Sequence, residues 1–141
     1  MAPAPGQLEL HRRAGELLRA AFGADQVREA NPDPAHPAHL VSVGRIGVRV
    51  SAEKIGDAAA VLEVSAWIAR GLQVTTEVGA YLAERTARLR FTALSVNDEG
   101  AIILQHALFA ESVAEPVLSR LVRVLAQSAD ALDEELRGRF G

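Results

Sequence analysis

Apolar residues recur at helical spacing near the start and in the middle of the chain, which predicts two amphipathic helices. The first covers residues 7–22, carries polar side chains on its other side and ends at Gly23. The second follows Thr75 or Thr76, because a threonine hydroxyl can accept a hydrogen bond from an unpaired N–H of the first helical turn.

A third apolar stripe near the end of the chain predicts a long closing helix. Pro116 suits its first turn, and Glu111 and Glu115 lie near the positive end of its dipole. We expect this helix to run to about Arg137, with Gly138 as its C-cap. The stripe consists of Leu118, Leu121, Val122, Leu125, Ala129, Leu132 and Leu136.

Alternating apolar and polar residues predict strands between the first two helices. The alternation runs over residues 40–50, where Gly44 and Gly47 indicate either a bulge or a tight bend between two short strands. Residues 52–57 are expected to form a turn, and residues 58–70 alternate again. This part of the chain therefore supplies two or three strands.

Two further strands are predicted after the middle helix, over residues 90–96 and 101–110. The polar connection at residues 97–100 predicts a hairpin in which Gly100 takes a positive φ. Residues 24–38 contain three prolines, which disfavour both a helix and a central strand, so a loop is expected there.

This order of elements predicts an α+β fold with a mainly antiparallel sheet of about five strands and helices packed on it. The expected order is helix, two or three strands, helix, two strands, helix. Residues 1–6 are expected to be a flexible tail, and residues 7–141 to form a single domain.

The composition of the 141 residues excludes several functional classes. Without cysteine there is no disulfide framework, no thiolate metal site and no cysteine nucleophile. A net charge of −3 argues against nucleic-acid binding, and no apolar run approaches the ~18 residues that a membrane span requires. No secretion signal is recognisable, so a cytoplasmic location is expected.

Motifs for catalysis or for cofactor binding are absent from the sequence. None of the serines lies in a Gly-x-Ser-x-Gly turn, and Gly44–Gly47 lacks the Lys-Ser/Thr ending of a phosphate loop. The acidic run at residues 133–135 is expected on a solvated helix face, since adjacent helical residues do not converge. We therefore predict a protein that is not an enzyme.

Histidines and one aspartate form the only candidate metal site that the sequence suggests. His36 and His39 are three residues apart with Asp33 nearby, but the proline-rich segment favours a solvated loop over a metal site. His11 and His106 are isolated in the sequence, and each is expected to be structural.

One face of the predicted sheet carries the residues that we expect to bind a partner. Trp67 is the only tryptophan and alternates with Glu63 and Ser65 on its strand, away from the aliphatic positions. Arg45, Arg49 and Arg90 are expected on the same face. Tryptophan and arginine are enriched at interface centres, although Trp67 could instead be core beneath the middle helix.

The chain resembles the YbjN-like proteins, which share the fold of type III secretion chaperones and include bacterial peptide-binding-chaperone-like domains. The order and spacing of four stretches carry the resemblance, and they lie at residues 43–50, 61–67, 94–104 and 124–136. The resemblance covers about residues 8–141 and implies a domain that binds a client protein or peptide, often as a homodimer. It implies neither catalysis nor a cofactor.

Two other functions remain open at this point. A small-molecule-binding regulatory domain would hold its ligand between the sheet and the middle helix, near Trp67 and Tyr81. An enzyme would use His106 or the loop histidines, and it would need at least two ionisable groups converging in one pocket.

Overall fold

The computed structural model describes residues 5–30, 33–57 and 59–141, which form three α-helices and a six-stranded sheet. The strand order is β1-β2-β3-β4-β6-β5, and every neighbouring pair is antiparallel. The elements are α1 (Pro5–Phe22), β1 (Val27–Glu29), β2 (Ala38–Val43), β3 (Ile46–Ile55), β4 (Ala59–Ile68), α2 (Thr76–Arg88), β5 (Ala93–Val96), β6 (Ile102–Phe109) and α3 (Val117–Phe140). The α+β class is as predicted, and the order of the elements matches the prediction except for one additional strand between the first two helices.

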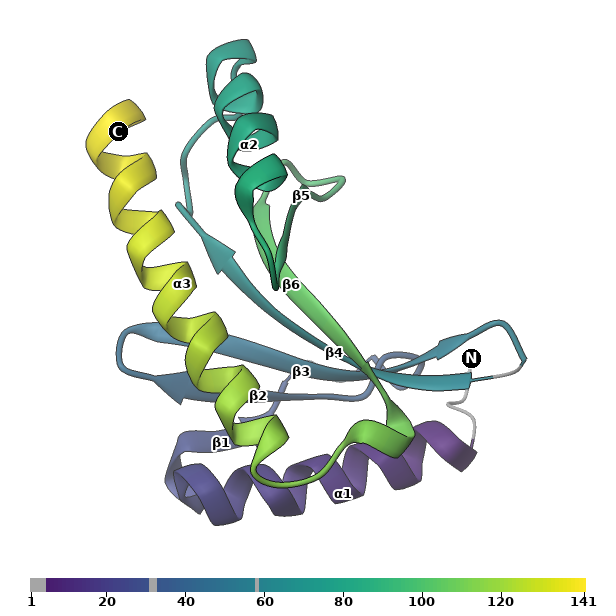
Figure 1. The fold of residues 1–141 in the computed structure, drawn as a ribbon. Helices are drawn as coiled ribbons and strands as arrows, with labels where there is room; N and C mark the ends of the chain where they lie inside the picture. Colours follow the sequence, from purple (N-terminus) through teal and green to yellow (C-terminus); the bar gives the residue numbers. More distant parts are fainter. Residues whose placement is uncertain (1–4, 31–32, 58) are drawn as a thin grey trace.

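The hydrophobic core lies between the helices and one face of the sheet. In Figure 1, α3 crosses in front of the strands while α1 runs below them. The core-facing strand positions include Val48, Val50 and Val64, and the buried side of α1 consists of Leu10, Ala14 and Leu18. All seven residues of the predicted α3 stripe are buried, which confirms the helical spacing as a signal for this core.

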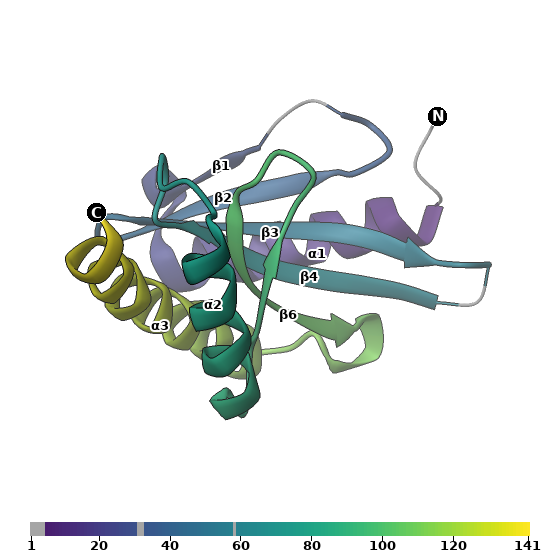
Figure 2. The ribbon, with the colours of Figure 1, turned by 90° about the horizontal axis from the view of Figure 1, so that it is seen from above.

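Helix α2 adjoins the C-terminal end of α3, as Figures 1 and 2 both show. The ring of Tyr81 packs edge-to-face against the ring of Phe140, with centroids 5.4 Å apart. The predicted N-cap is confirmed, because the Thr75 hydroxyl accepts a hydrogen bond from the Val78 N–H over 3.3 Å. The predicted positive φ of Gly100 is also confirmed, at 80°.

The proline-rich segment was expected to be a loop throughout, and this prediction is wrong in part. Residues Val27–Glu29 form the edge strand β1, and β2 begins at Ala38, directly after Pro37. An edge strand pairs on one side only, so neighbouring prolines interrupt no second ladder. This strand raises the sheet from about five strands to six.

Several predicted boundaries also differ from the structure, including that of the strand expected over residues 90–96, which begins only at Ala93. The first helix begins at Pro5, so residues 5 and 6 are not part of a tail, and the expected tail over residues 1–4 lies outside the described residues. The chain bends at Gly44, with φ 60°, whereas Gly47 is an ordinary strand residue. Strand β3 continues to Ile55, through most of the expected turn at residues 52–57, because its residues 49–55 all pair with β4.

Helix α3 also continues past Gly138, which was expected to be its C-cap, and ends at Phe140. Packing explains the extension, since Leu136 is fully buried and Phe140 contacts Tyr81. The stabilisation from these contacts outweighs the cost of about 1 kcal/mol for a glycine inside a helix. Gly141 follows as the C-cap.

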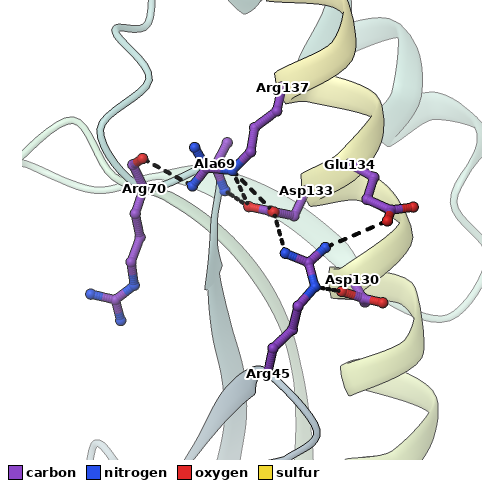
Figure 3. A network of polar contacts seen from close by, with 7 residues as sticks. All are labelled: Arg45, Ala69, Arg70, Asp130, Asp133, Glu134 and Arg137. Carbon is purple, nitrogen blue, oxygen red and sulfur yellow. Dashed lines mark hydrogen bonds and ion pairs between the residues drawn. The ribbon is translucent and has the colours of Figure 1, made fainter. Parts of the chain in front are cut away.

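A buried carboxylate, Asp133, joins α3 to the end of β4 and to the β2–β3 turn (Figure 3). Its side chain accepts a hydrogen bond of 2.6 Å from the backbone N–H of Ala69 and two of 3.1 and 3.2 Å from Arg137 Nε. Arg45, from the turn, contacts Asp133 at 3.3 Å and also pairs with Asp130. The expectation that Asp133 is solvated is therefore wrong, because the residue faces the sheet.

The charge of Asp133 is stabilised in the folded state. Burial by itself raises the pKa of this carboxyl, but the hydrogen bond from the Ala69 N–H and the guanidinium of Arg137 outweigh burial and hold the pKa below its ordinary value. A lowered pKa means that the ionised form contributes stability at neutral pH, and that this contribution is lost as the pH falls below about 4.

We expect Asp133→Ala to lower the free energy of unfolding by about 2–3 kcal/mol, because it leaves the Ala69 N–H without its charged acceptor. Asp133→Asn keeps an acceptor at this position and should lose less at pH 7. Urea denaturation between pH 3 and pH 7 measures both effects. The Asn variant should show a flatter decline of stability below about pH 4 than the wild type. An Ala variant as stable as the wild type would contradict the role assigned to this carboxylate.

Candidate functional site

The face of the sheet opposite the core has no helix packed on it in the described part of the chain. All three helices contribute their buried residues to one core cluster, and that cluster uses only one set of alternating strand positions. We call the other set the open face. It comprises Arg49, Ser51, Glu53, Val61, Glu63, Ser65, Trp67, Ile103 and Gln105.

Small side chains in the middle of the open face leave it hollow. Ser51 pairs with Glu63 across β3 and β4, and Ser65 pairs with Arg49 on one side and Gln105 on the other. Both serines are almost fully covered by their larger neighbours, with exposures of 5% and 8%. The result is a hollow of about 300 Å³, with serines in its floor and long polar side chains around it.

Trp67 lies between this hollow and a second one. It lines the hollow over the serines and also a larger hollow of about 560 Å³ formed with residues 68–74 and 99–102. The indole is half-buried, pairs with Ile103 across the sheet and has the guanidinium of Arg70 4.9 Å from its ring centre. A rigid aromatic ring between two hollows offers contact area on both sides.

Polar groups on the open face have unused hydrogen-bonding capacity. The Nε of Arg49 is buried without a hydrogen-bond partner, and a buried donor left unpaired is costly. Within the described residues, neither the Trp67 indole N–H nor the Glu63 carboxylate has a hydrogen-bond partner. The open face can therefore offer two donors and one negatively charged acceptor to a bound molecule.

The structure brings together three of the five predicted partner-binding residues and places the other two elsewhere. Arg49, Glu63 and Trp67 share the hollow over the serines. Arg90 precedes β5 and borders a neighbouring hollow of about 370 Å³, which Glu63 also lines. Arg45 does not lie on the open face, because its position in a turn lets it extend to the acidic residues of α3 (Figure 3).

Two residues of the open face were missed because their strand was cut short in the prediction. Glu53 was assigned to a turn, and Ser51 preceded it at an expected strand end. Strand alternation counted onward from Arg49 would have placed both on this face. The Ser51 hydroxyl donates a hydrogen bond to Glu53, which in turn contacts His36.

The four histidines do not form the sites that the sequence suggested. His36 contacts Glu53 at the open face, whereas His39 is not in a loop but in β2, where its side chain is buried on the opposite face beside His11. Burial lowers the pKa of His39 below its ordinary value. His106 stacks on Phe91 and its Nδ1 lies 2.8 Å from the Phe91 carbonyl oxygen.

The residues expected for the two alternative functions, a small-molecule site and a catalytic site, do not come together in the structure. Trp67 and Tyr81 do not line a common hollow in the described part of the chain, because Tyr81 is buried against Phe140 and Trp67 lies on the other face of the sheet. Trp67 is accordingly not core beneath the middle helix. His36, His39 and His106 have separate partners and do not converge.

Comparison with known families identifies the class of protein to which this arrangement belongs. A model of peptide-binding chaperones matches residues 9–141, nearly the whole chain. The chain belongs to this family, TY-Chap1, described as T3SS (YopN, CesT) and YbjN peptide-binding chaperone 1. The YbjN-like resemblance seen in the sequence is thereby confirmed. No curated protein matches the chain significantly.

None of the helices in the described ranges combines the length and the apolar character that crossing a membrane requires.

We expect the pKa of His36 to lie above the ordinary value for histidine. The hydrogen bond to Glu53 raises this pKa, and the attraction between the two charges raises it further. The pair therefore stabilises the loop against β3 at acidic pH, and this contribution is lost as the pH rises through the His36 pKa. A pH titration followed by NMR on the histidine side chains measures the value. In Glu53→Gln the pKa should fall towards about 6.5, and an unchanged value would contradict the pairing.

Proposed function

We propose that the protein is a non-enzymatic module that binds an extended segment of a client protein on the open face, with Trp67 as the central contact. The observation that carries the proposal is the position of Trp67 between two hollows on a sheet face that no described helix covers. Membership in a peptide-binding chaperone family supports the kind of ligand. Buried aromatic contacts dominate many peptide and protein interfaces.

The chemistry of the open face indicates which peptide would fit. Trp67 would pack against an apolar or aromatic side chain, and the unpaired carboxylate of Glu63 would attract a basic one. The buried Nε of Arg49 would donate to a peptide carbonyl or carboxylate. Trp67 and Glu63 are four residues apart on one strand, which corresponds to about 13 Å, so an extended ligand along β4 would space its anchors similarly.

We also propose that the protein forms a homodimer through an apolar surface between β6 and α3. A hollow of about 380 Å³ lies there, lined by Phe91, His106, Leu108, Val117, Arg120, Leu121 and Val124. Three of these apolar side chains, Phe91, Val117 and Val124, are exposed by 51%, 48% and 37%. Exposed apolar side chains gathered around one hollow are typical of an interaction surface, and none of the residues that line this hollow belongs to the open face.

We expect Trp67→Ala to weaken peptide binding at least ~30-fold, which corresponds to about 2 kcal/mol. Peptides would first be selected from a random displayed library on the wild-type protein. Their binding can then be followed in the wild type by the fluorescence of Trp67, the single tryptophan of the chain, and in all variants by calorimetry.

Leu8→Ala is the matched control for this experiment, because Leu8 is a half-exposed apolar side chain on α1, away from the open face. It should bind the selected peptides as the wild type does. Selected peptides should also contain an apolar residue and a basic residue. Equal binding by the wild type and a folded Trp67→Ala variant would contradict the proposed site.

We expect light scattering to give a mass of twice 15.0 kDa for the wild type. Val124→Glu places a charge in the apolar hollow and should shift the mass to that of one chain, because an unpaired charge cannot be desolvated at low cost. Val96→Glu, an exposed valine on β5 outside this hollow, is the control and should remain dimeric. A wild type that scatters as a single chain at micromolar concentration would refute the dimer without affecting the peptide site.

A further inference from the structure

Three potential metal ligands from three different elements meet on the core side of the sheet edge. His11 belongs to α1, Glu29 ends β1 and His39 lies in β2. One ligand atom from each side chain lies within 4.8 Å of the other two. Glu29 Oε1 is 3.0 Å from His11 Nε2 and 3.7 Å from His39 Nδ1, so both rings approach the same carboxylate oxygen.

His39 is held in one orientation, with an unused nitrogen towards this carboxylate. Its side chain is only 2% exposed, and its Nε2 lies 2.8 Å from the backbone carbonyl oxygen of His11. A carbonyl can only accept, so in the neutral ring Nε2 carries the proton and Nδ1 keeps a lone pair. That Nδ1 is buried and has no hydrogen-bond partner. A buried lone pair facing a carboxylate oxygen is unfavourable unless a cation or a proton lies between them.

The neighbouring helix makes room for this ring. A Cβ atom on Gly15 of α1 would lie 2.6 and 2.7 Å from His39 Cε1 and Nε2, closer than real contacts allow. A glycine inside a helix costs about 1 kcal/mol relative to alanine. At this position it lets a buried histidine approach the helix backbone and donate to the His11 carbonyl. A second ring nitrogen fixed by a backbone carbonyl is typical of metal-binding histidines.

We propose that His11, Glu29 and His39 bind a divalent transition-metal ion, with Zn²⁺ as the best fit. Two imidazoles and one carboxylate are an established zinc ligand set that leaves a fourth position open. Bonds of about 2.0–2.1 Å in a tetrahedral site place ligand atoms about 3.3 Å apart. The two separations in the structure, 3.0 Å from His11 Nε2 and 3.7 Å from His39 Nδ1 to Glu29 Oε1, lie on either side of this value.

Binding requires one local movement. The two imidazole rings are stacked, with centroids 3.9 Å apart and an angle of 4° between their planes. An ion binds along the lone pair in the plane of each ring, so one ring must tilt out of the stack. His11 can do this, because His39 is held by its hydrogen bond, whereas the tilt of His11 gives up its stacking on His39 and its contact with Glu29 but no hydrogen bond to the backbone. Glu29 is exposed and can follow.

The test is a titration of the tag-free protein with Co²⁺ followed by visible absorption, and with Zn²⁺ followed by calorimetry. We expect one saturable site, tetrahedral-type absorption bands with Co²⁺, loss of those bands on adding Zn²⁺, and a higher melting temperature with Zn²⁺. His11→Gln and Glu29→Gln each remove one ligand and should weaken binding at least ~100-fold, since even the loss of an outer-shell partner costs 10–100-fold.

His36→Gln is the matched control, because it removes a histidine that also contacts a glutamate, Glu53, but on the opposite face of the sheet. It should bind metal as the wild type does. Circular dichroism confirms that each variant is folded. The proposal would be overturned by the absence of saturable binding at micromolar metal, by unchanged binding in His11→Gln or Glu29→Gln, or by equal loss in His36→Gln. None of these results bears on peptide binding at Trp67.

Discussion

Strand β4 contributes side chains to two different surfaces, the core and the open face. The rest of the structure depends on its register. Leu62, Val64, Ala66 and Ile68 are buried against the helices, while Glu63, Ser65 and Trp67 form the centre of the open face. Because side chains alternate with a period of two, a slip of one residue would bury Glu63 and Trp67 and expose the aliphatic set. The register is fixed from both sides, since β4 pairs with β3 and with β6 over most of its length.

The end of β4 is held by the carboxylate of Asp133. Ala69 follows the strand with φ 50°, a left-handed conformation that costs a non-glycine residue about 1–2 kcal/mol. The charged hydrogen bond from its N–H to Asp133 offsets this cost, and the same carboxylate holds Arg45 of the β2–β3 turn. One side chain of α3 therefore fixes the chain where β4 leaves the sheet, two residues after Trp67. Arg45 serves this network, which explains why an arginine at a turn is not part of the open face.

Secondary structure and side-chain burial could be predicted from the sequence where a local period of apolar residues determines them. They could not be predicted where contacts between elements distant in the sequence determine them. The α3 stripe and the side of β4 that carries Trp67 follow directly from spacings of 3.6 and 2, and both were predicted. The edge strand β1 was missed because Val27–Glu29 is too short to show alternation and becomes a strand only by pairing with β2. The buried position of His39 depends on Gly15, which is 24 positions earlier in the chain, and no periodicity connects the two.

Adjacent residues of β2 and β3 serve opposite faces of one sheet, which separates the two proposed sites. His39 pairs with Val50 and faces the helices, whereas Leu40 pairs with Arg49 on the open face. The cluster of His11, Glu29 and His39 and the hollow at Trp67 therefore have no side chain in common, although they lie on the two faces of the same sheet. A ligand on one face can affect the other only by moving the backbone of β2 or β3, and the strands paired on both sides of each resist such movement. We accordingly expect the proposed metal binding at His39 and the proposed peptide binding at Trp67 to be independent of each other.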